Sequence, residues 1–378
     1  MRNLKRALSL TLASVMLLGM MVVGTSAASF PDVTAEDNVE AIEVLAEVKV
    51  LQGYDDGQYH AENPVTRNQM ATIICRMMGW RDGDFAGLNP FPDVPDWAAN
   101  YVAACVANGI INGRDDGRFH GDDTVTATEA ASMMLRALGY TRMPVGAAWA
   151  QAVAQQASRI NLFKDLSVGA NTALTRGDVA QLSLNTLQAT MVDVEDNTLN
   201  ISGGTSDNPF NISGGQINYI VRTSDDDKIG KAIREGTVAG GGTSSSQLNG
   251  QTLELGEQVY QGDLKKIEDT DDFGAPAYRW TYKKAEIGTY AKAADVTYTS
   301  EVKVKDLYRD MGLSAETTGD NLTIEEDGDP YAGTVTKLVK SGDDGDKKLG
   351  GNGVVVKAYK TEDSDDDNID EVTICIIN

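Results

Sequence analysis

A segment of the chain recurs sixty residues further on, and this repeat constrains the fold more than any other feature. Residues 50–66, VLQGYDDGQYHAENPVT, align without gaps with residues 110–126, IINGRDDGRFHGDDTVT. A Phe-Pro-Asp-Val sequence precedes each copy, at residues 30–33 and 91–94. A period of this size is typical of one supersecondary unit stacked several times, usually at least three.

A degenerate third copy runs from residue 149 to residue 187. It keeps Leu174-Thr175-Arg176 and the apolar pattern that follows, but it lacks the Asp-Asp-Gly loop. We therefore expect three tandem repeats, the third degenerate. Their boundaries are predicted at residues 29–80, 91–140 and 141–190.

Each repeat is predicted to form a helix, a loop and a second helix. In the first repeat, an apolar stripe recurs at three-residue steps, as in an amphipathic helix, at Val39, Ile42, Leu45 and Val48. We expect Gly53 to end this helix and Asp56-Gly57 to form a turn. The second helix is predicted to begin after Thr66.

The start of each second helix is marked by a capping box, in which a hydroxyl and the side chain three residues later satisfy amides at the helix end. The pairs are Thr66 with Gln69, Thr126 with Glu129 and, more weakly, Thr175 with Asp178.

Residues 1–28 have the composition of an export signal. A positive start (Arg2, Lys5, Arg6) precedes an apolar run over residues 7–23, and small residues fill positions 25–28. A membrane anchor is the alternative, because the run approaches the roughly 20 residues that span a bilayer. We expect a signal peptide and an exported protein, and no later segment is long and apolar enough to span a membrane.

The composition excludes several partners and chemistries. The 378 residues carry a net charge of -23, which argues against nucleic acid or an anionic membrane surface as main partner. Three cysteines and two histidines, His60 and His120, rule out a disulfide framework or a Cys/His-rich metal cluster. We expect no cofactor. The acidic clusters at residues 225–227 and 363–371 lack EF-hand spacing, and they are either calcium sites or solvated acidic surface.

The repeats resemble the S-layer homology (SLH) domain. The resemblance rests on the Phe-x-Asp-Val sequence, the Gly-x-x-Asp-Gly-x-Phe loop and the Thr-Arg helix start, and covers residues 30 to about 190. It implies a three-repeat, pseudo-threefold helical module. It also implies non-covalent binding of secondary cell-wall polysaccharide, often pyruvylated, by a protein at the cell surface.

Two arginines at helix starts are the leading ligand candidates. Arg67 and Arg176 stand at the first helical position, where a cation opposes the helix dipole. Free amides at a helix start suit an anion, and an arginine adds a bidentate clamp for a carboxylate such as that of a pyruvyl ketal. The alternative is a solvated arginine or a bridge to a carboxylate of a neighbouring repeat. Ala127 replaces the arginine in the second repeat.

Other candidates each have a structural alternative to ligand contact. Thr66 and Thr175 are sufficiently explained as helix caps. Asp32 and Asp93 suit turns as well as ligand contact. The loop glycines, Gly53 and Gly113, complete the set with Trp97, which either fills the core or stacks on a sugar ring.

The second half of the chain, residues 191–378, is predicted to be β-rich. Its strand-like runs are 216–222, 251–260, 277–282, 294–304, 331–340, 353–359 and 371–377, with a short helix around residues 305–311. Residues 240–246 have the composition of a linker. Residues 273–311 resemble a segment of large surface proteins of anaerobic Firmicutes.

The predicted fold class is therefore multidomain α+β, with three helix-loop-helix repeats followed by a β-rich region. The favoured function is a non-enzymatic anchor of a surface or S-layer-type protein. The alternative is an SLH-anchored extracellular hydrolase whose catalytic part is the β-rich region. Self-assembly in a surface layer is a further alternative. The final strand-like run leads us to expect either a truncated product or the N-terminal part of a longer protein.

Overall fold

The structure is a computed structural model in which two compact units are described separately. It describes residues 30–34, 37–81, 83–143, 146–195, 200–202, 211–213, 218–224, 251–361 and 370–378. The N-terminal unit extends from Ala27 to Leu264, and the C-terminal unit contains Lys265–Asn378. The predicted signal peptide and the predicted linker at residues 240–246 lie outside the described residues.

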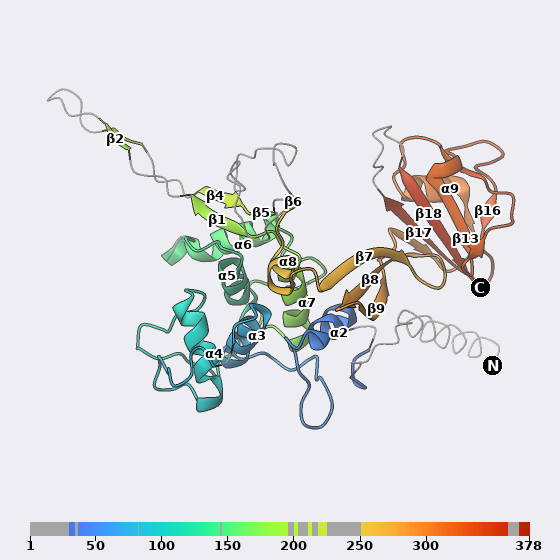
Figure 1. Cartoon of the computed structure of the whole chain (residues 1–378). Coiled ribbons are helices and arrows are strands. Elements are labelled where there is room, and N and C mark those ends of the chain that lie inside the picture. The colour runs from blue at the N-terminus through green and yellow to red at the C-terminus, as the bar shows by residue number, and fades with distance from the viewer. Residues whose placement is uncertain are drawn as a thin grey trace. The chain divides into compact units, whose positions relative to one another are not determined.

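The N-terminal unit contains three successive helix pairs (Figure 1). The first pair is α2 (Val39–Glu47) and α3 (Arg67–Met77), the second is α4 (Asp96–Ala107) and α5 (Ala127–Ala137), and the third is α6 (Trp149–Arg159) and α7 (Arg176–Leu187). The short 3-10 helix Gly146–Ala148 precedes α6.

All three predicted capping boxes are present. The Thr66 Oγ1 accepts from the Gln69 amide at 3.3 Å, and the Thr66 amide donates to Gln69 Oε1 at 2.9 Å. The pairs at the starts of α5 and α7 repeat this exchange. These reciprocal bonds satisfy amides that lack a partner within the helix, which is why each second helix begins where the pattern predicts.

The predicted end of the first helix is wrong. Helix α2 ends at Glu47, and Lys49 takes the left-handed conformation with φ of 65° before the chain turns into the loop. Gly109 takes the matching place after α4, with φ of 70°. Gly53 therefore lies beyond the helix, inside the loop. The predicted Asp56-Gly57 turn is confirmed, because the Gly57 amide donates to the Tyr54 carbonyl at 2.9 Å.

Each second helix packs against the first helix of the next pair. Helix α3 contacts α4, α5 contacts α6, and α7 returns to contact α2. The buried apolar faces of these helices include Ile42, Leu45, Met70, Ile74, Met134 and Leu182. Because the last helix closes on the first, the three pairs bury one continuous apolar interior.

Backbone hydrogen bonds join the three pairs in a closed ring. The amide of Val65 donates to the carbonyl of Leu174, that of Leu174 to Val125, and that of Val125 to Val65, at 2.9–3.0 Å. Each of these residues lies two positions before its second helix. The ring therefore fixes the starts of α3, α5 and α7 relative to one another.

The N-terminal unit continues past residue 190, where the sequence analysis placed the change of architecture. Strands β1 (Val192–Glu195), β4 (Asn218–Val221), β5 (Thr223–Ser224) and β6 (Gln251–Thr252) follow α7, with helix α8 (Leu255–Tyr260) and the small β2–β3 hairpin (Asn200–Ser202, Asn211–Ser213). The Val192 amide donates to the Leu138 carbonyl. The Met191 amide donates to the Leu253 carbonyl, and the Met191 carbonyl accepts from the Arg222 amide. These bonds tie the short strands to the helix pairs.

Several sheets make up the C-terminal unit. A three-stranded sheet has the order β7 (Leu264–Thr270), β8 (Pro276–Tyr282), β9 (Ala285–Ala291). A five-stranded sheet has the order β10 (Val296–Tyr298), β17 (Val355–Thr361), β18 (Glu371–Ile377), β13 (Leu322–Glu326), β14 (Asp329–Pro330). Strands β13 and β18 are parallel, and the other neighbours are antiparallel.

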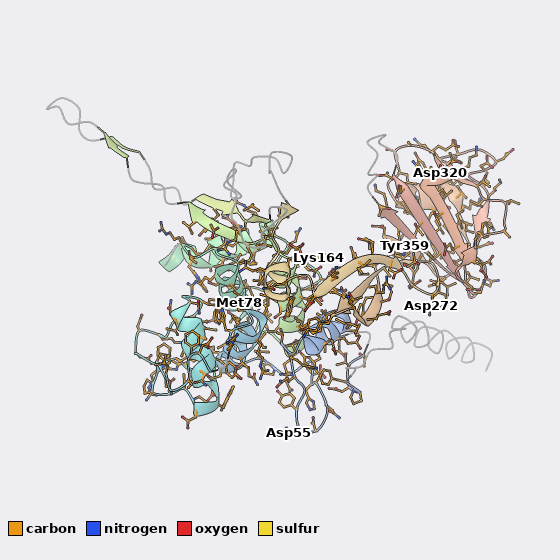
Figure 2. The ribbon with its side chains drawn as sticks, in the orientation of Figure 1. Asp55, Met78, Lys164, Asp272, Asp320 and Tyr359 are labelled. Carbon is orange, nitrogen blue, oxygen red and sulfur yellow. The ribbon has the colours of Figure 1, made fainter. Side chains whose placement is uncertain are left out.

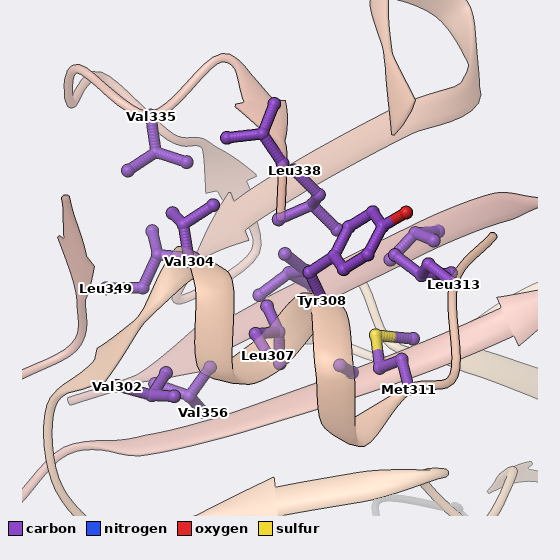
Figure 3. Close-up of a cluster of buried hydrophobic side chains, with 14 of the residues drawn as sticks. Val302, Val304, Leu307, Tyr308, Met311, Leu313, Val335, Leu338, Leu349 and Val356 are labelled. Atoms are coloured by element: carbon purple, nitrogen blue, oxygen red, sulfur yellow. The ribbon is translucent and has the colours of Figure 1, made fainter. Parts of the chain in front are cut away.

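Helix α9 (Val304–Asp310) covers one face of the five-stranded sheet. Figure 3 shows Leu307 and Tyr308 of this helix among the surrounding apolar side chains, with Val356 of the sheet below. Two-residue ladders, β11 (Val302–Lys303) with β16 (Lys348–Leu349) and β12 (Thr317–Thr318) with β15 (Lys337–Leu338), surround this core, and the 3-10 helix Gly319–Asn321 follows β12.

The predicted β-rich character holds, but two predicted strands do not. Most of the predicted strand at residues 251–260 is helix α8, which begins with a capping box between Glu254 and Glu257. The predicted strand at residues 331–340 shrinks to β15. Within the described residues, no helix is long and apolar enough to cross a membrane.

Candidate functional site

Arg176 connects the third helix pair to the loop of the first. Its Nε donates to the Tyr59 carbonyl at 2.8 Å and its Nη2 to the Gln52 carbonyl at 2.7 Å. The guanidinium lies over the rings of Tyr59 and Tyr54, at 4.4 and 4.7 Å from their centroids. Only 9% of Arg176 is exposed, so it is a built-in part of the fold.

Arg67 makes the same contacts one repeat further on. Its Nε donates to the Phe119 carbonyl and its Nη2 to the Asn112 carbonyl, both at 3.0 Å, and its guanidinium lies 4.7 Å from the Phe119 ring centroid. Burial lowers the pKa of Arg67 below its ordinary value. Both arginines therefore bridge repeats through backbone carbonyls, whereas the sequence alternative named a neighbouring carboxylate.

The amides at the helix starts are occupied, so the expectation of free amides is wrong. The Arg67 amide donates to the Asp123 carbonyl and the Asn68 amide to Gly121, both at 2.9 Å. Loop carbonyls of the first repeat serve the start of α7 in the same way. A loop from the next repeat thus replaces the anion that the sequence analysis assigned to this position.

Ala127 follows the same backbone pattern without the guanidinium. Its amide donates to the Thr172 carbonyl, and the Thr128 amide donates to the Ala170 carbonyl. The third repeat lacks the Asp-Asp-Gly loop whose carbonyls the arginines bind. An arginine at position 127 would therefore lack the loop that holds Arg67 and Arg176.

Asp32 and Asp93 hold the loops of their own repeats. The amides of Tyr59 and His60 donate to the two carboxylate oxygens of Asp32 at 2.8 and 2.6 Å. The equivalent amides donate to Asp93 at 2.9 and 2.8 Å. Burial acts to raise the pKa of each carboxyl, but these amide bonds outweigh it and lower the pKa.

Gly53 and Gly113 make room for the phenylalanines of the Phe-Pro-Asp-Val sequences. A Cβ at Gly53 would lie 2.5 Å from Phe30 Cε1 and 2.9 Å from the Gln58 carbonyl oxygen. A Cβ at Gly113 would collide with the Phe91 ring. Each loop is thus packed on its own repeat at this glycine, and the loop of the first repeat is the one that includes Asp55, labelled in Figure 2.

A groove of about 370 Å³ lies where the first repeat, helix α4 and Arg176 meet. Its lining comes from the segment that follows α2, from α3, from α4 and from α7, and comprises Val50, Leu51, Gln52, Gln69, Thr72, Ile73, Arg76, Trp97, Tyr101 and Arg176. Trp97 is 56% exposed. Of the two alternatives for Trp97, the structure therefore shows an exposed ring at a groove.

The charged residues that line this groove are both arginines. Arg76 lies with its guanidinium 5.7 Å from the Tyr101 ring centroid, and Arg176 contributes the second positive charge. Among the residues that the structure describes, no carboxylate lines the groove, although the whole chain has a net charge of -23. Cations beside aromatic rings suit an acidic sugar, because the ring stacks on sugar carbons and the guanidinium pairs with the acid.

The groove brings together two of the predicted candidates, Trp97 and Arg176. The remaining candidates do not line it; they are Arg67, Thr66, Thr175, Asp32, Asp93, Gly53 and Gly113. The residue patterns did not mark Arg76, Tyr101 or Gln69 as ligand candidates, although they placed Gln69 in the capping box of Thr66. One available signal was the recurrence of Arg76 as Arg136 in the aligned repeats.

The histidines lie in the loops and contact aspartates. The Nε2 of His60 lies 2.7 Å from Asp56 Oδ2, and that of His120 lies 2.6 Å from Asp116 Oδ2. In the described part of the chain, no group of three or more Asp, Glu, His and Cys side chains is placed to hold a metal ion. The acidic clusters at residues 225–227 and 363–369 lie outside the described residues.

Comparison with known proteins assigns the repeats. The family model of the S-layer homology domain matches residues 29–71 and 90–131. The predicted third repeat is not among the matched residues. The two matched segments are therefore SLH repeats, and such repeats imply an exported protein that is anchored at the cell wall.

Its relatives include larger surface proteins and an enzyme. The chain is 31% identical to the middle cell wall protein of Brevibacillus brevis over 50% of its own length and 18% of the relative's. It is 28% identical to a cell surface protein of Thermoanaerobacter kivui over 52% of its length and 26% of the relative's. An amylopullulanase of Thermoanaerobacterium thermosulfurigenes matches at 32% over 29% of this chain.

The chain spans about a quarter or less of these relatives. The match to the amylopullulanase covers 6% of that enzyme, so it assigns no activity to this chain.

Proposed function

We propose that the N-terminal unit anchors the protein non-covalently by binding a secondary cell-wall polysaccharide that carries acidic groups such as pyruvyl ketals. The observation that carries the proposal is the groove in which Trp97 and Arg176 meet. The matched SLH repeats support wall anchoring, and the groove supplies a cation and an exposed ring for an acidic sugar.

Arg176 has donors left for a ligand. Its bonds to the loop use Nε and one N–H of Nη2, while a guanidinium also carries N–H groups on Nη1. The loop carbonyls and the two tyrosine rings hold the guanidinium in place. A carboxylate that pairs with it would therefore cost little side-chain entropy.

We further propose that residues 141–190 are a degenerate third repeat that completes a pseudo-threefold module. Helix α7 begins with the same capping box as α3 and α5, and Leu174 takes part in the same ring of backbone bonds as Val65 and Val125. Its contribution to binding is Arg176, which it places in the groove of the first repeat.

The test is co-sedimentation of the full chain with cell-wall sacculi, before and after extraction of the polysaccharide. We expect binding only to intact sacculi, and Trp97→Ala should weaken it roughly five- to tenfold through loss of ring stacking. Leu88→Ala is the matched control, because Leu88 is equally exposed at 56% and does not line the groove. Equal binding to extracted sacculi would contradict the proposal.

A further inference from the structure

The two equivalent arginines lie in different charge surroundings. The charges of Glu129 and Asp123 act to raise the pKa of Arg67, and the charge of Arg114 acts to lower it. Sixty positions earlier the sequence has Gln69, Asn63 and Tyr54, which are uncharged. Gln69 lines a groove together with Arg176, the Asn63 carbonyl accepts from the Arg176 amide, and the Arg176 guanidinium lies over the Tyr54 ring.

The contacts show that this alignment is spatial as well as sequential. Arg67 binds the carbonyls of Phe119 and Asn112, and Arg176 binds those of Tyr59 and Gln52, each shifted by the same sixty residues. Gln69 and Glu129 also occupy the same place in their helices, since each closes the capping box of its repeat. Each therefore stands in the same relation to its arginine.

Gln69 is neutral, whereas Glu129 at the equivalent place carries a negative charge, so an anion meets a less positive set of side chains at the second position. Gln69 lines the groove, whose charged residues are Arg76 and Arg176. The equivalent set in the next repeat contains Arg136 and Arg67 but also Glu129. Asp123 is paired with Arg114 at 2.7 Å, so the unbalanced difference between the two sets is the Glu129 carboxylate.

The aromatic side chain differs as well. Trp97 is largely exposed beside α3, whereas the indole N–H of Trp149, at the equivalent place beside α5, donates to Ser132 Oγ at 3.3 Å. The remaining second helix, α5, begins with Ala127 in place of an arginine. Two of the three equivalent positions thus lack a feature that an acidic sugar needs.

We propose that the module binds acidic wall polysaccharide at one position only, the groove of Arg176, and that Gln69 determines this selectivity. The inference rests on the proposed function. A neutral amide at position 69 leaves both groove arginines available to the ligand acid, while the carboxylate of Glu129 competes for Arg67 and repels the ligand. Gln69 acts on the ligand's acid through the charge of the groove.

The reciprocal exchange Gln69→Glu and Glu129→Gln tests this assignment in the full chain. Either residue can close a capping box, so each variant should melt at a temperature close to that of the parent. The probe is a pyruvyl-ketal oligosaccharide released from wall polysaccharide. The same oligosaccharide after mild-acid removal of the ketal is the neutral comparison. Titration calorimetry gives affinity and stoichiometry.

We expect one site per parent chain and roughly tenfold weaker binding for Gln69→Glu, which corresponds to about 1.4 kcal/mol. Neutral oligosaccharide should bind both chains alike, and Glu129→Gln should gain a second, weaker site for the acidic probe. Two sites in the parent, unchanged affinity in Gln69→Glu, or a single site in Glu129→Gln would each overturn the inference. Failure of the parent to bind either probe would instead overturn the proposed function.

Discussion

The amide of Val65 donates to the carbonyl of Leu174 at 3.0 Å and thereby joins the first helix pair to the third. Val125 completes the ring with the second pair, so no pair can separate without breaking two of these bonds. The packing of α7 on α2 closes the same circle through side chains. The three pairs should therefore fold as one cooperative unit.

Removal of the third pair tests this cooperativity. A chain of residues 27–140 would expose the face of α2 that α7 covers, including Ile42 and Leu45, which are fully buried. Each such side chain contributes about 1.5–3 kcal/mol, a large share of the roughly 5–15 kcal/mol that stabilises a domain. We expect no cooperative thermal transition by circular dichroism for 27–140, and one for 27–264. A sharp transition of the shorter chain would show that the pairs fold separately.

Replacement of Arg67 should destabilise the fold, contrary to what its helix position alone indicates. From its helix position, Arg67 was predicted to be a ligand group and not a structural bridge between backbone carbonyls. Arg67→Met removes two charged bonds and leaves the carbonyls of Phe119 and Asn112 without partners, at a cost of about 1–3 kcal/mol for each buried group. Arg67→Lys should recover part of this. Guanidinium chloride unfolding measures the difference.

Arg118→Met is the matched control, because Arg118 is an exposed arginine of the loop that Arg67 binds. Equal stabilities of the Arg67→Met and Arg118→Met chains would remove the bridging role of Arg67.

The helix pairs were predictable because their causes are local. Capping boxes and three-residue apolar spacing act within one turn or two, so Thr66 with Gln69 sufficed to place the start of α3. The hydrogen-bond partners of the two arginines are not local in sequence. Arg67 bonds a carbonyl 52 residues away and Arg176 one 117 residues away, and no spacing rule links such positions. The groove was missed in part for the same reason.

Short apolar runs in the second half were ambiguous between strand and helix. The run at residues 251–260 mixes apolar and polar residues in a way that suits both, and the capping box of Glu254 with Glu257 decided for helix α8. The run at residues 371–377 formed β18 with the predicted bounds, because its alternating residues Val372, Ile374 and Ile376 are buried on one face of a central strand.

Acid should weaken the N-terminal unit through Asp32 and Asp93. Their carboxylates accept loop amides, and their pKa values in the folded state are lowered. This contribution is complete above the unfolded pKa of about 3.9 and disappears as the pH falls through the lower folded value. Asp32→Asn, which can accept only one of the two amides, should be less stable than the parent at pH 7. The gap should narrow between about pH 4 and pH 2 in urea unfolding.

Asp55→Asn is the control for this experiment, because Asp55 is an exposed carboxylate of the same loop. A gap between Asp32→Asn and the parent that stays constant down to pH 2 would mean that the Asp32 charge contributes nothing to the loop.

The C-terminal unit should respond to changes in its central strand without a matching response of the helix pairs. Ile374 of β18 is fully buried between β17 and β13 under α9, and all its cluster neighbours belong to this unit. Ile374→Ala should cost about 2–5 kcal/mol, because the surrounding side chains refill such a cavity only in part. Thr373 is the preceding residue of the same strand and lies on its opposite face, so Thr373→Ala should lower the free energy of unfolding much less. Differential scanning calorimetry of the full chain should show Ile374→Ala lowering one transition, with the helical transition followed by circular dichroism at 222 nm unchanged. Equal shifts of both transitions would show that the two units do not unfold independently.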